Sequence, residues 1–521
     1  MKELITLSKG VTKLFFLLCF YSLLSGCSLP SLDNRPASSA LIKTEARTTR
    51  LGMAIAPRVD QHPGKSGIYP LPNPYDAFAA RMLLAKAADR TLDVQYYIWH
   101  KDITGTLLLE ALHAAAKRGV RVRLLLDDNG ISEMDEDLKS LDNHPNIEVR
   151  LFNPFMVRKP KWLGYITDFS RANRRMHNKS FTADNQTTII GGRNVGDEYF
   201  GASNGVLFAD LDILCVGPVV DDVSSGFDIY WASESSYPVG LILPHVRQER
   251  MEQLTMAADV IECDPAASNF INAVKHSAFI NELLGGSLNM EWAPARMVSD
   301  DPAKGLGKAE AKGLLSHQLE EILGVSNHDV ALVSPYFVPT ATGVEAFSKM
   351  ARCGVKVRIL TNSLDATDVA AVHAGYAKWR KALLESGITL YEMSSQSSGT
   401  AGRKSSSFVG SSGSSLHAKT FAMDGESIFV GSFNFDPRSI NLNTELGFVI
   451  DSPALARQIG IAFDSVIPTH AYQVLLGGDD KLYWIEKQGE KQIRYDHDPR
   501  TTCWKRGVVF LLSLLPIEWL L

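Results

Sequence analysis

Long apolar runs are scarce in this chain of 521 residues. The two clearest lie near its ends, over residues 14–24 and 507–521, and both are shorter than the roughly 20 residues that a membrane-spanning helix needs. A strong charge of one sign is also lacking, since 53 Lys and Arg stand against 58 Asp and Glu. These absences exclude a polytopic membrane protein, and they argue against a nucleic-acid partner, because nucleic-acid binders usually carry a basic excess.

Cysteine is scarce too, with only six widely spaced residues at positions 19, 27, 215, 263, 353 and 503. None of them forms the Cys-x-x-Cys or Cys/His spacing that is typical of a zinc site. We therefore expect no metal and no cofactor. What is present, 45% hydrophobic and 21% charged residues, is the composition of a globular protein with room for several hydrophobic cores.

The N-terminus has the layout of a signal peptide. A basic stretch precedes the apolar run 14–24, and the tetrad LSGC at 24–27 resembles a bacterial lipobox. That resemblance implies lipidation of Cys27 and a protein anchored to a bacterial membrane on its periplasmic side. The C-terminal segment 507–521 leaves two interpretations open, a helix at the membrane interface or a segment packed on the core.

Between its ends the chain contains two copies of one pattern. LDVQYYIW at 92–99 and VALVSPYF at 330–337 each precede a helix-like segment, a glycine turn and a second strand. Strands that alternate with helices predict βαβ units in a parallel or mixed sheet. We expect a signal peptide over 1–26, a tether over 27–65, a first domain over 66–250, a second domain over 251–470, and a C-terminal hairpin with an apolar tail over 471–521.

Each copy carries the same polar residues at the same spacing: a histidine, then a lysine 2 residues later, an aspartate at 7, a small residue at 15 and an asparagine at 17. Two such matches at corresponding places in a repeat are not chance. The first set is His177, Lys179, Asp184, Gly192 and Asn194, and the second is His417, Lys419, Asp424, Ser432 and Asn434.

These residue types suit a phosphodiester. Side chains two apart on a strand point to the same side, so each imidazole and its lysine ammonium face one ligand. Lysine neutralises a phosphate oxygen, asparagine donates to it without adding charge, and small residues such as Gly192 and Ser432 let the backbone approach an anion. One imidazole is expected to attack phosphorus and form a phosphohistidine, while the other serves as general acid and then base.

Each catalytic histidine also needs an acid on its second nitrogen. Glu445 follows His417 by 28 residues, and Asp210 or Asp212 follows His177 at a similar distance, so these three are the candidates. Asp184 and Asp424 fall in turns, and we interpret them mainly as residues that order the site.

The paired motifs resemble the HKD motifs of the phospholipase D superfamily. More narrowly, the segments around 175–200 and 416–439 resemble bacterial cardiolipin synthases, most closely the C type. The resemblance implies an α/β fold of two similar sandwich halves with one active site at their interface. It also implies metal-free transfer of a phosphatidyl group to phosphatidylglycerol, with His177 as nucleophile, phosphatidylethanolamine as donor and a helper protein.

Three other functions stay open at this point: a phospholipase D that hydrolyses headgroups, a nuclease or other phosphodiesterase, and a catalytically inactive lipid-binding scaffold. The balanced charge argues against nucleic acid, and the intact motifs argue against a scaffold. A basic-aromatic loop with Arg158, Lys159, Lys161 and Trp162 could grip anionic headgroups or simply face solvent. Asp127 and Asp128 are interpreted as a strand-end turn.

Overall fold

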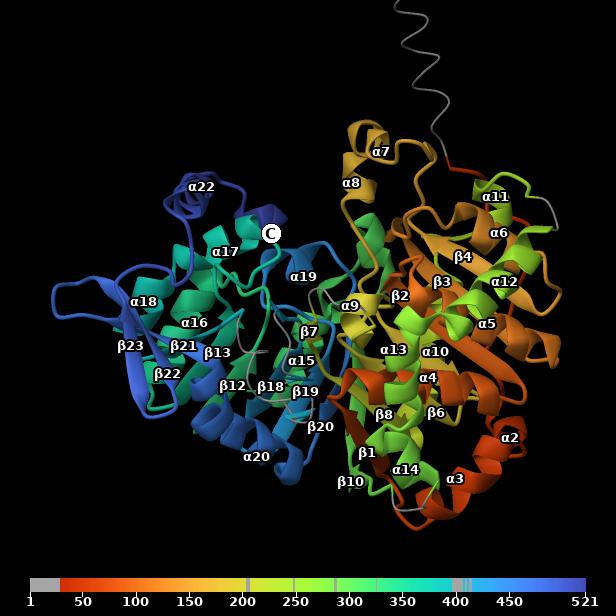
Figure 1. Ribbon diagram of the computed structural model, residues 1–521, viewed down its shortest axis with the longest axis horizontal. Helices are drawn as coiled ribbons and strands as arrows, with labels where there is room; N and C mark the ends of the chain where they lie inside the picture. Colours follow the sequence, from red (N-terminus) through yellow and green to blue (C-terminus); the bar gives the residue numbers. More distant parts are fainter. Residues whose placement is uncertain are drawn as a thin grey trace, which may run out of the picture.

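The computed structural model describes residues 29–202, 207–246, 249–284, 288–324, 326–395, 406–407, 410–411 and 415–521. The expected signal peptide and Cys27 lie outside these residues. Figure 1 shows two lobes side by side, the first coloured red to green and the second green to blue. Each lobe contains a large sheet, which confirms the expected α/β fold of two similar halves.

The first sheet contains nine strands. In spatial order they are β10 (Glu291–Ala293), β1 (Ser66–Leu71), β8 (Asp212–Val216), β6 (Thr187–Gly191), β5 (Ser180–Ala183), β2 (Thr91–Ile98), β3 (Arg121–Gly130), β4 (Ile147–Phe152) and β9 (Ser236–Pro238). The strands β2, β3 and β4 run parallel, whereas β5, β6 and β8 are antiparallel neighbours. The helices between parallel strands are the crossovers that βαβ units require.

The second sheet repeats this arrangement and has ten strands. In spatial order they are β11 (Ala295–Ser299), β20 (Leu446–Ile450), β19 (Ser427–Gly431), β18 (Lys419–Met423), β12 (Asp329–Val333), β13 (Lys356–Asn362), β14 (Thr389–Met393), β21 (Ala471–Leu476), β22 (Leu482–Gln488) and β23 (Lys491–Tyr495). The expected C-terminal hairpin thus extends the sheet.

Helices cover the outer face of each sheet (Figure 1). In the first half these include α4 (Pro74–Ala87), α5 (Ile103–Lys117), α6 (Asp135–Asp142), α12 (Glu249–Cys263), α13 (Pro265–Lys275) and α14 (Ala278–Leu284). In the second half they include α15 (Leu315–Leu323), α16 (Thr340–Arg352), α17 (Ala370–Ala377) and α18 (Arg380–Glu385). Within the described part of the chain, no helix is both long enough and apolar enough to span a membrane.

The remaining helices are α2 (Lys43–Ala46), α3 (Arg50–Asp60), α7 (Leu163–Thr167), α8 (Phe169–Ala172), α9 (Asp197–Phe200), α10 (Pro218–Trp231), α11 (Val239–Ile242), α19 (Pro437–Asn441), α20 (Pro453–Ile461), α21 (Ile467–His470) and α22 (Cys503–Ser513). They include α2 and α3, which lie within residues 27–65, where the sequence predicted a tether.

Helices α12 to α14 pack on α4, α5 and α6 of the first half, and β10 belongs to the first sheet. The sequence placed these elements in the second domain, after residue 250. We therefore place the division between the halves after β10, because the apolar faces of these helices are buried against the first half.

The two halves share one hydrophobic core. Neighbouring strand residues point to opposite faces, and in β6 Ile189 packs under the outer helices while Ile190 joins the shared core. In β19 Phe429 and Val430 divide in the same way between the outer and the shared core. The inner faces of both sheets therefore pack together, which brings the matching ends of corresponding strands to one seam.

Candidate active site

His177 and His417 lie at the seam, each hydrogen-bonded through its backbone to the other half. His177 precedes β5, and its N–H donates to the Thr444 carbonyl at 2.8 Å. His417 follows β17 (Ser415–Leu416), which pairs with β7 (Phe208–Ala209), and its N–H donates to the Ala209 carbonyl at 2.8 Å. The short pairings across the seam thus position both imidazoles.

The acid partners of the histidines also cross between the halves. His177 Nδ1 lies 2.8 Å from Glu445 Oε2, and His417 Nδ1 lies 2.6 Å from Asp210 Oδ2. Both carboxylates are fully buried. The sequence singled out Glu445 and Asp210 as orienting acids, but it counted each from the histidine of its own half. In the structure each one serves the histidine of the opposite half.

Asp212, the third candidate, has a different partner. Its Oδ2 accepts a hydrogen bond from Arg81 Nη2 at 2.7 Å, and its Oδ1 accepts from the Arg193 backbone N–H at 3.1 Å. It begins β8 and its carboxylate is used by this buried ion pair, so it does not serve as the orienting acid. The interpretation of Asp212 as an orienting residue is therefore corrected.

The small residues support these acids. Ser432 Oγ donates to Glu445 Oε2 at 2.5 Å, and Ser439 Oγ donates to Glu445 Oε1 at 3.0 Å. At the corresponding position in the first half, a Cβ added to Gly192 would lie 2.1 Å from Asp210 Oδ1. The structure thus gives Ser432 and Gly192 a place beside the carboxylates, where the sequence predicted contact with phosphate.

The two lysines are buried beside the histidines. Lys179 Nζ donates to the His177 carbonyl at 2.6 Å, and Lys419 Nζ lies 3.1 Å from His417 Nε2. Burial, and then the charge of Lys419, lowers the pKa of Lys179 well below its usual value. Burial lowers the pKa of Lys419 to about 8. Two mutually repelling ammonium groups in a buried place favour the binding of an anion between them.

The two asparagines differ in their surroundings. Asn194 is satisfied by protein groups, since its Oδ1 accepts from the Ile98 N–H at 3.2 Å and its Nδ2 donates to the Tyr199 hydroxyl at 3.0 Å. Asn434 is buried, and among the described residues its Oδ1 has no hydrogen-bond partner. A buried amide that lacks a partner usually belongs to a site where a ligand or water binds, so Asn434 is the better placed of the two to contact substrate.

Asp184 and Asp424 hold turns away from the imidazoles. Asp184 accepts hydrogen bonds from the backbone N–H groups of residues 89–91, at the start of β2. Asp424 does the same for residues 327–329 at the start of β12. Burial raises the pKa of Asp424, but the amide hydrogen bonds outweigh it and hold the pKa at about 2. Both aspartates therefore order the start of the strand that leads to the site.

The two histidines have different electrostatic surroundings. Burial, followed by the charges of Lys179 and Lys419, lowers the pKa of His177 far below its usual value. Burial also lowers the pKa of His417, but there the charge of Asp210 opposes the shift. Among the acids, burial raises the pKa of Glu445 to about 7. The pKa of Asp210 is lowered because the attraction of His417 outweighs burial.

Aromatic rings, which the sequence did not single out, enclose both imidazoles. Tyr97 meets the His177 ring edge to face at 5.0 Å, and Tyr199 meets the His417 ring in the same way at 5.2 Å. Phe208 packs on His417 at 5.1 Å. Of these, Tyr97 could have been found, because it stands in the first repeated strand, LDVQYYIW.

Two cations of the basic-aromatic loop form ion pairs within the protein. Arg158 and Lys161 both bind the buried Asp128, and Arg158 also binds Asp135. Asp127 accepts from the Met176 N–H at 2.7 Å and so fixes the residue before His177. Asp127 and Asp128 lie within β3, not in a strand-end turn as the sequence predicted, and they anchor this loop and the catalytic segment. Of the expected headgroup-binding side chains only Lys159 and Trp162 stay exposed.

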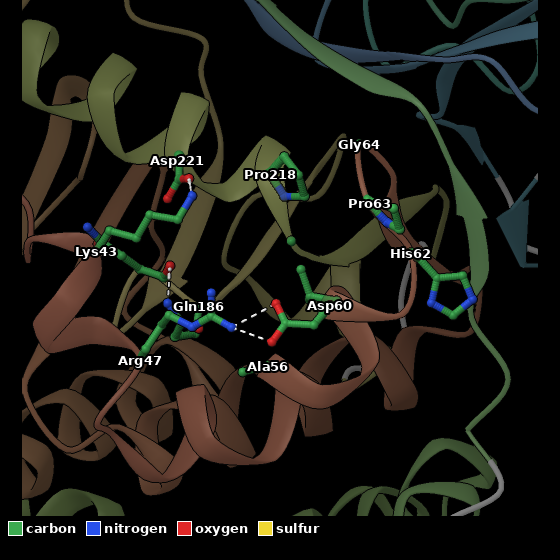
Figure 2. A pocket seen from close by; sticks show the side chains of 13 residues that line it. Lys43, Arg47, Ala56, Asp60, His62, Pro63, Gly64, Gln186, Pro218 and Asp221 are labelled. Carbon is green, nitrogen blue, oxygen red and sulfur yellow. Dashed lines mark hydrogen bonds and ion pairs between the residues drawn. The ribbon is translucent and has the colours of Figure 1, made fainter.

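Two other features lie apart from the imidazole–acid pairs. Among the described residues, His100, Asp102 and Glu198 lie close enough together to hold a metal ion, but Asp102 caps α5 and His100 pairs with Glu198. A pocket of about 250 Å³ lies between α3 and the start of α10 (Figure 2). Its two cations are already paired, Lys43 with Asp221 and Arg47 with Asp60.

Comparison with known proteins agrees with this geometry. The family model described as cardiolipin synthase, phospholipase D-like domain, matches residues 82–216 and 319–467. Cardiolipin synthase C of Escherichia coli (strain K12) is 50% identical over 472 residues, which is 91% of this chain and 100% of the relative. An uncharacterized protein of Helicobacter pylori (strain ATCC 700392 / 26695) is 31% identical and covers 88% of this chain and 90% of its own length.

Among solved structures, the phosphatidylserine synthase of Haemophilus influenzae Rd KW20 superposes with a TM-score of 0.56. It covers 89% of this chain and 99% of its own length at 13% identity, and it therefore shows a shared fold. The family model spans more than half of the chain in two segments, and each segment contains one histidine, lysine and aspartate motif. The chain belongs to the cardiolipin synthase, phospholipase D-like family.

Proposed function

We propose that this chain is a cardiolipin synthase that transfers a phosphatidyl group to phosphatidylglycerol through a phosphohistidine. The observation that carries the proposal is the pair of crossed contacts, His177 with Glu445 and His417 with Asp210. With each Nδ1 bound to a carboxylate, Nε2 is the nitrogen left for chemistry on each ring, and in His417 it lies 3.1 Å from the Lys419 ammonium group. The identity to a cardiolipin synthase over nearly the whole chain supports the same reaction.

His177 is the proposed nucleophile. It stays neutral because burial and two nearby lysines lower its pKa, and a neutral imidazole has the lone pair that attack requires. Its Nε2 forms a bond to the phosphorus of the donor phospholipid as the bond from phosphorus to the headgroup oxygen breaks. Glu445 stabilises the charge that develops on the imidazole.

His417 is the proposed general acid and base. Burial and the charge of Lys419 lower the pKa of His417, and the ionised Asp210 carboxylate at its Nδ1 opposes this, so the protonated form is less disfavoured than in His177. His417 gives the Nε2 proton to the leaving headgroup oxygen, and then takes the proton of a phosphatidylglycerol hydroxyl. That hydroxyl oxygen attacks phosphorus, the bond from phosphorus to His177 breaks, and the product is cardiolipin.

Lys179, Lys419 and Asn434 are the proposed ligands of the phosphate oxygens. The two ammonium groups lie beside the histidines, and the buried Asn434 side chain carries an amide N–H that can donate to a phosphate oxygen. Phosphate would restore the full charge of both lysines, because a nearby anion raises the pKa of an ammonium group. Positive charge and hydrogen-bond donors at the non-bridging oxygens then stabilise the transition state.

The donor and the helper protein in the proposal come from the family resemblance, and the anchor comes from the lipobox-like tetrad. We propose phosphatidylethanolamine as donor, a helper protein, and an anchor on Cys27 that holds the enzyme at the periplasmic side of a bacterial membrane. Hydrolysis by water is the competing outcome at the same site. Nucleic acid is disfavoured as substrate, because the net charge is −5.

Product analysis tests the proposal. Purified protein is incubated with EDTA in vesicles of phosphatidylethanolamine and phosphatidylglycerol, and the lipids are followed by mass spectrometry. We expect cardiolipin from the wild type and none from His177→Ala or His417→Ala. Phosphatidic acid without cardiolipin would mean a hydrolase, and absence of any lipid turnover, also with extract that supplies a helper protein, would contradict the proposal.

A further inference from the structure

Exposed tryptophans gather at one side of the molecule. The chain contains eight tryptophans, and Trp162, Trp504 and Trp519 expose 59%, 81% and 56% of their surface. Trp162 precedes α7, Trp504 lies in α22, and Trp519 lies in the short C-terminal helix η4 (Glu518–Leu520). These elements lie along the upper edge of both lobes (Figure 1).

The first half contributes the α7–α8 segment to this edge. Besides Trp162, the side chains of Ile166 and Phe169 are exposed there. Lys159 is exposed next to them, and within the described residues it has no ion-pair or hydrogen-bond partner. Apolar side chains beside a free cation are typical of surfaces that meet a lipid headgroup layer.

The second half contributes α22, which is amphipathic. Val509 packs on Leu364 and Ala374 next to α17, whereas the other side of the helix exposes Phe510, Leu511 and, just beyond its end, Leu514. Packing in the hydrophobic core does not explain a helix that contacts the rest of the protein along one side and exposes its larger apolar residues on the other. We call the exposed apolar residues of α7, α8, α22 and η4, together with Trp162 and Leu514 next to these helices, the apical face.

Arg438 connects the apical face to the active site. Its Nη2 donates to the Asn173 carbonyl at 2.8 Å, at the end of α8, and its Nη1 donates to the Leu520 carbonyl at 3.3 Å, in η4. Arg438 also belongs to α19, four residues after Asn434, and its charge contributes to the lowered pKa of His177. Arg438 therefore links the end of α8 and η4 to the catalytic residues.

We propose that the apical face docks on a phospholipid bilayer, with α22 and the α7–α8 segment in the headgroup layer on either side of α19 (Figure 1). This deepens the proposed function and rests on it, since both substrates keep their acyl chains in the bilayer. Tryptophans suit the membrane interface, and the described chain begins at this same edge (Figure 1) with residue 29, which follows the predicted anchor residue Cys27 by two positions in the sequence.

Quenching by brominated lipids tests the docking in the full chain. Bromine on the acyl chains quenches only tryptophans that enter the bilayer, so the readout is independent of how the chain is otherwise held at the membrane. With vesicles of phosphatidylcholine and brominated phosphatidylglycerol, we expect strong quenching of the wild type and loss of most of it in Trp162→Phe/Trp504→Phe/Trp519→Phe. Quenching that is absent, or equal in this variant, would overturn the proposal.

A further double variant and its control distinguish a role in membrane docking from a role in catalysis. Leu511→Glu/Leu514→Glu is expected to lower turnover on vesicles at least tenfold and to leave turnover of dispersed short-chain lipids unchanged. The control is Ile461→Glu, at an equally exposed residue of α20 on the opposite edge, which should change neither (Figure 1). An equal loss on both substrates, or a dimer that the double variant disrupts without any change on vesicles, would assign the apical face to another role.

Discussion

Glu445 of the second half binds His177 of the first half, although 268 residues of sequence separate them. The reciprocal contact joins His417 to Asp210 over 207 residues. Each half thus contributes one imidazole and the acid for the other imidazole. A single half cannot form either pair, so the site depends on the shared core that holds the two sheets together.

The first prediction separates Asp210 from Asp212, two fully buried acids that lie two residues apart. Asp210→Asn should lower kcat roughly 10²–10⁴-fold at little cost in stability, because His417 loses the charge that favours its protonated form. Asp212→Asn should instead cost about 3–5 kcal/mol of stability, because it leaves Arg81 buried without its ion-pair partner. Steady-state kinetics of the folded fraction and urea unfolding measure the two effects, and the reverse pattern would contradict the assignment.

A second prediction concerns Gly192. Because a Cβ at this position would lie 2.1 Å from Asp210 Oδ1, Gly192→Ala should displace the carboxylate and lower kcat at least about 100-fold. Gly478→Ala is the matched control, since a Cβ added to Gly478 would have no atom within 4 Å among the described residues. Equal activity of the two variants would show that the Asp210 carboxylate tolerates displacement.

The third prediction is a bell-shaped dependence of kcat/KM on pH. Glu445 must be ionised to accept the proton of His177 Nδ1, and its pKa of about 7 predicts a rise in activity through that pH. Lys419 must be charged to bind phosphate, and its pKa of about 8 predicts a fall above that pH. In Lys419→Arg the acidic limb should remain while the alkaline limb moves to higher pH. An alkaline limb that stays in place would exclude Lys419 as its cause.

The fourth prediction is that Asp424 acts on stability. Its pKa of about 2 is below the usual 3.8, so the stabilising effect of its carboxylate is complete above about pH 4 and is lost as the pH falls toward 2. The stability gap between wild type and Asp424→Asn should therefore shrink on acidification, while kcat of the folded enzyme stays the same. Denaturant unfolding over a pH series measures the gap. A large loss of kcat at unchanged stability would instead indicate a role in catalysis.

The repeat made much of the site predictable. Two histidines and two lysines at matching positions predicted one shared pocket, and the family match confirms the resemblance to the phospholipase D superfamily. The repeat also contained the information that separates the two acid candidates. Asp210-Leu211 corresponds to Glu445-Leu446 at the start of β8 and β20, whereas Asp212 corresponds to a glycine, Gly447.

The sequence could not predict that each acid pairs with the histidine of the opposite half, because this pairing depends on how the two sheets pack. Counting along the sequence assigned Glu445 to His417, which lies 28 residues before it. In the folded protein, the bridge between Met176 and Thr444 places Glu445 next to His177. The ion pair of Arg158 could not be predicted for a similar reason, since its partner Asp128 lies 30 residues away in β3. Such contacts follow from tertiary structure and leave no local pattern.

The most direct test of the central claim uses His417→Ala and a phosphatidyl ester of p-nitrophenol. This leaving group departs without a general acid, so His177 should still attack phosphorus, while the acceptor step should fail without a base. We predict a burst of about one p-nitrophenolate per chain and a phosphatidyl adduct on the peptide that contains His177, both absent in His177→Ala. A burst that persists in His177→Ala, or an adduct on any other residue, would contradict the account.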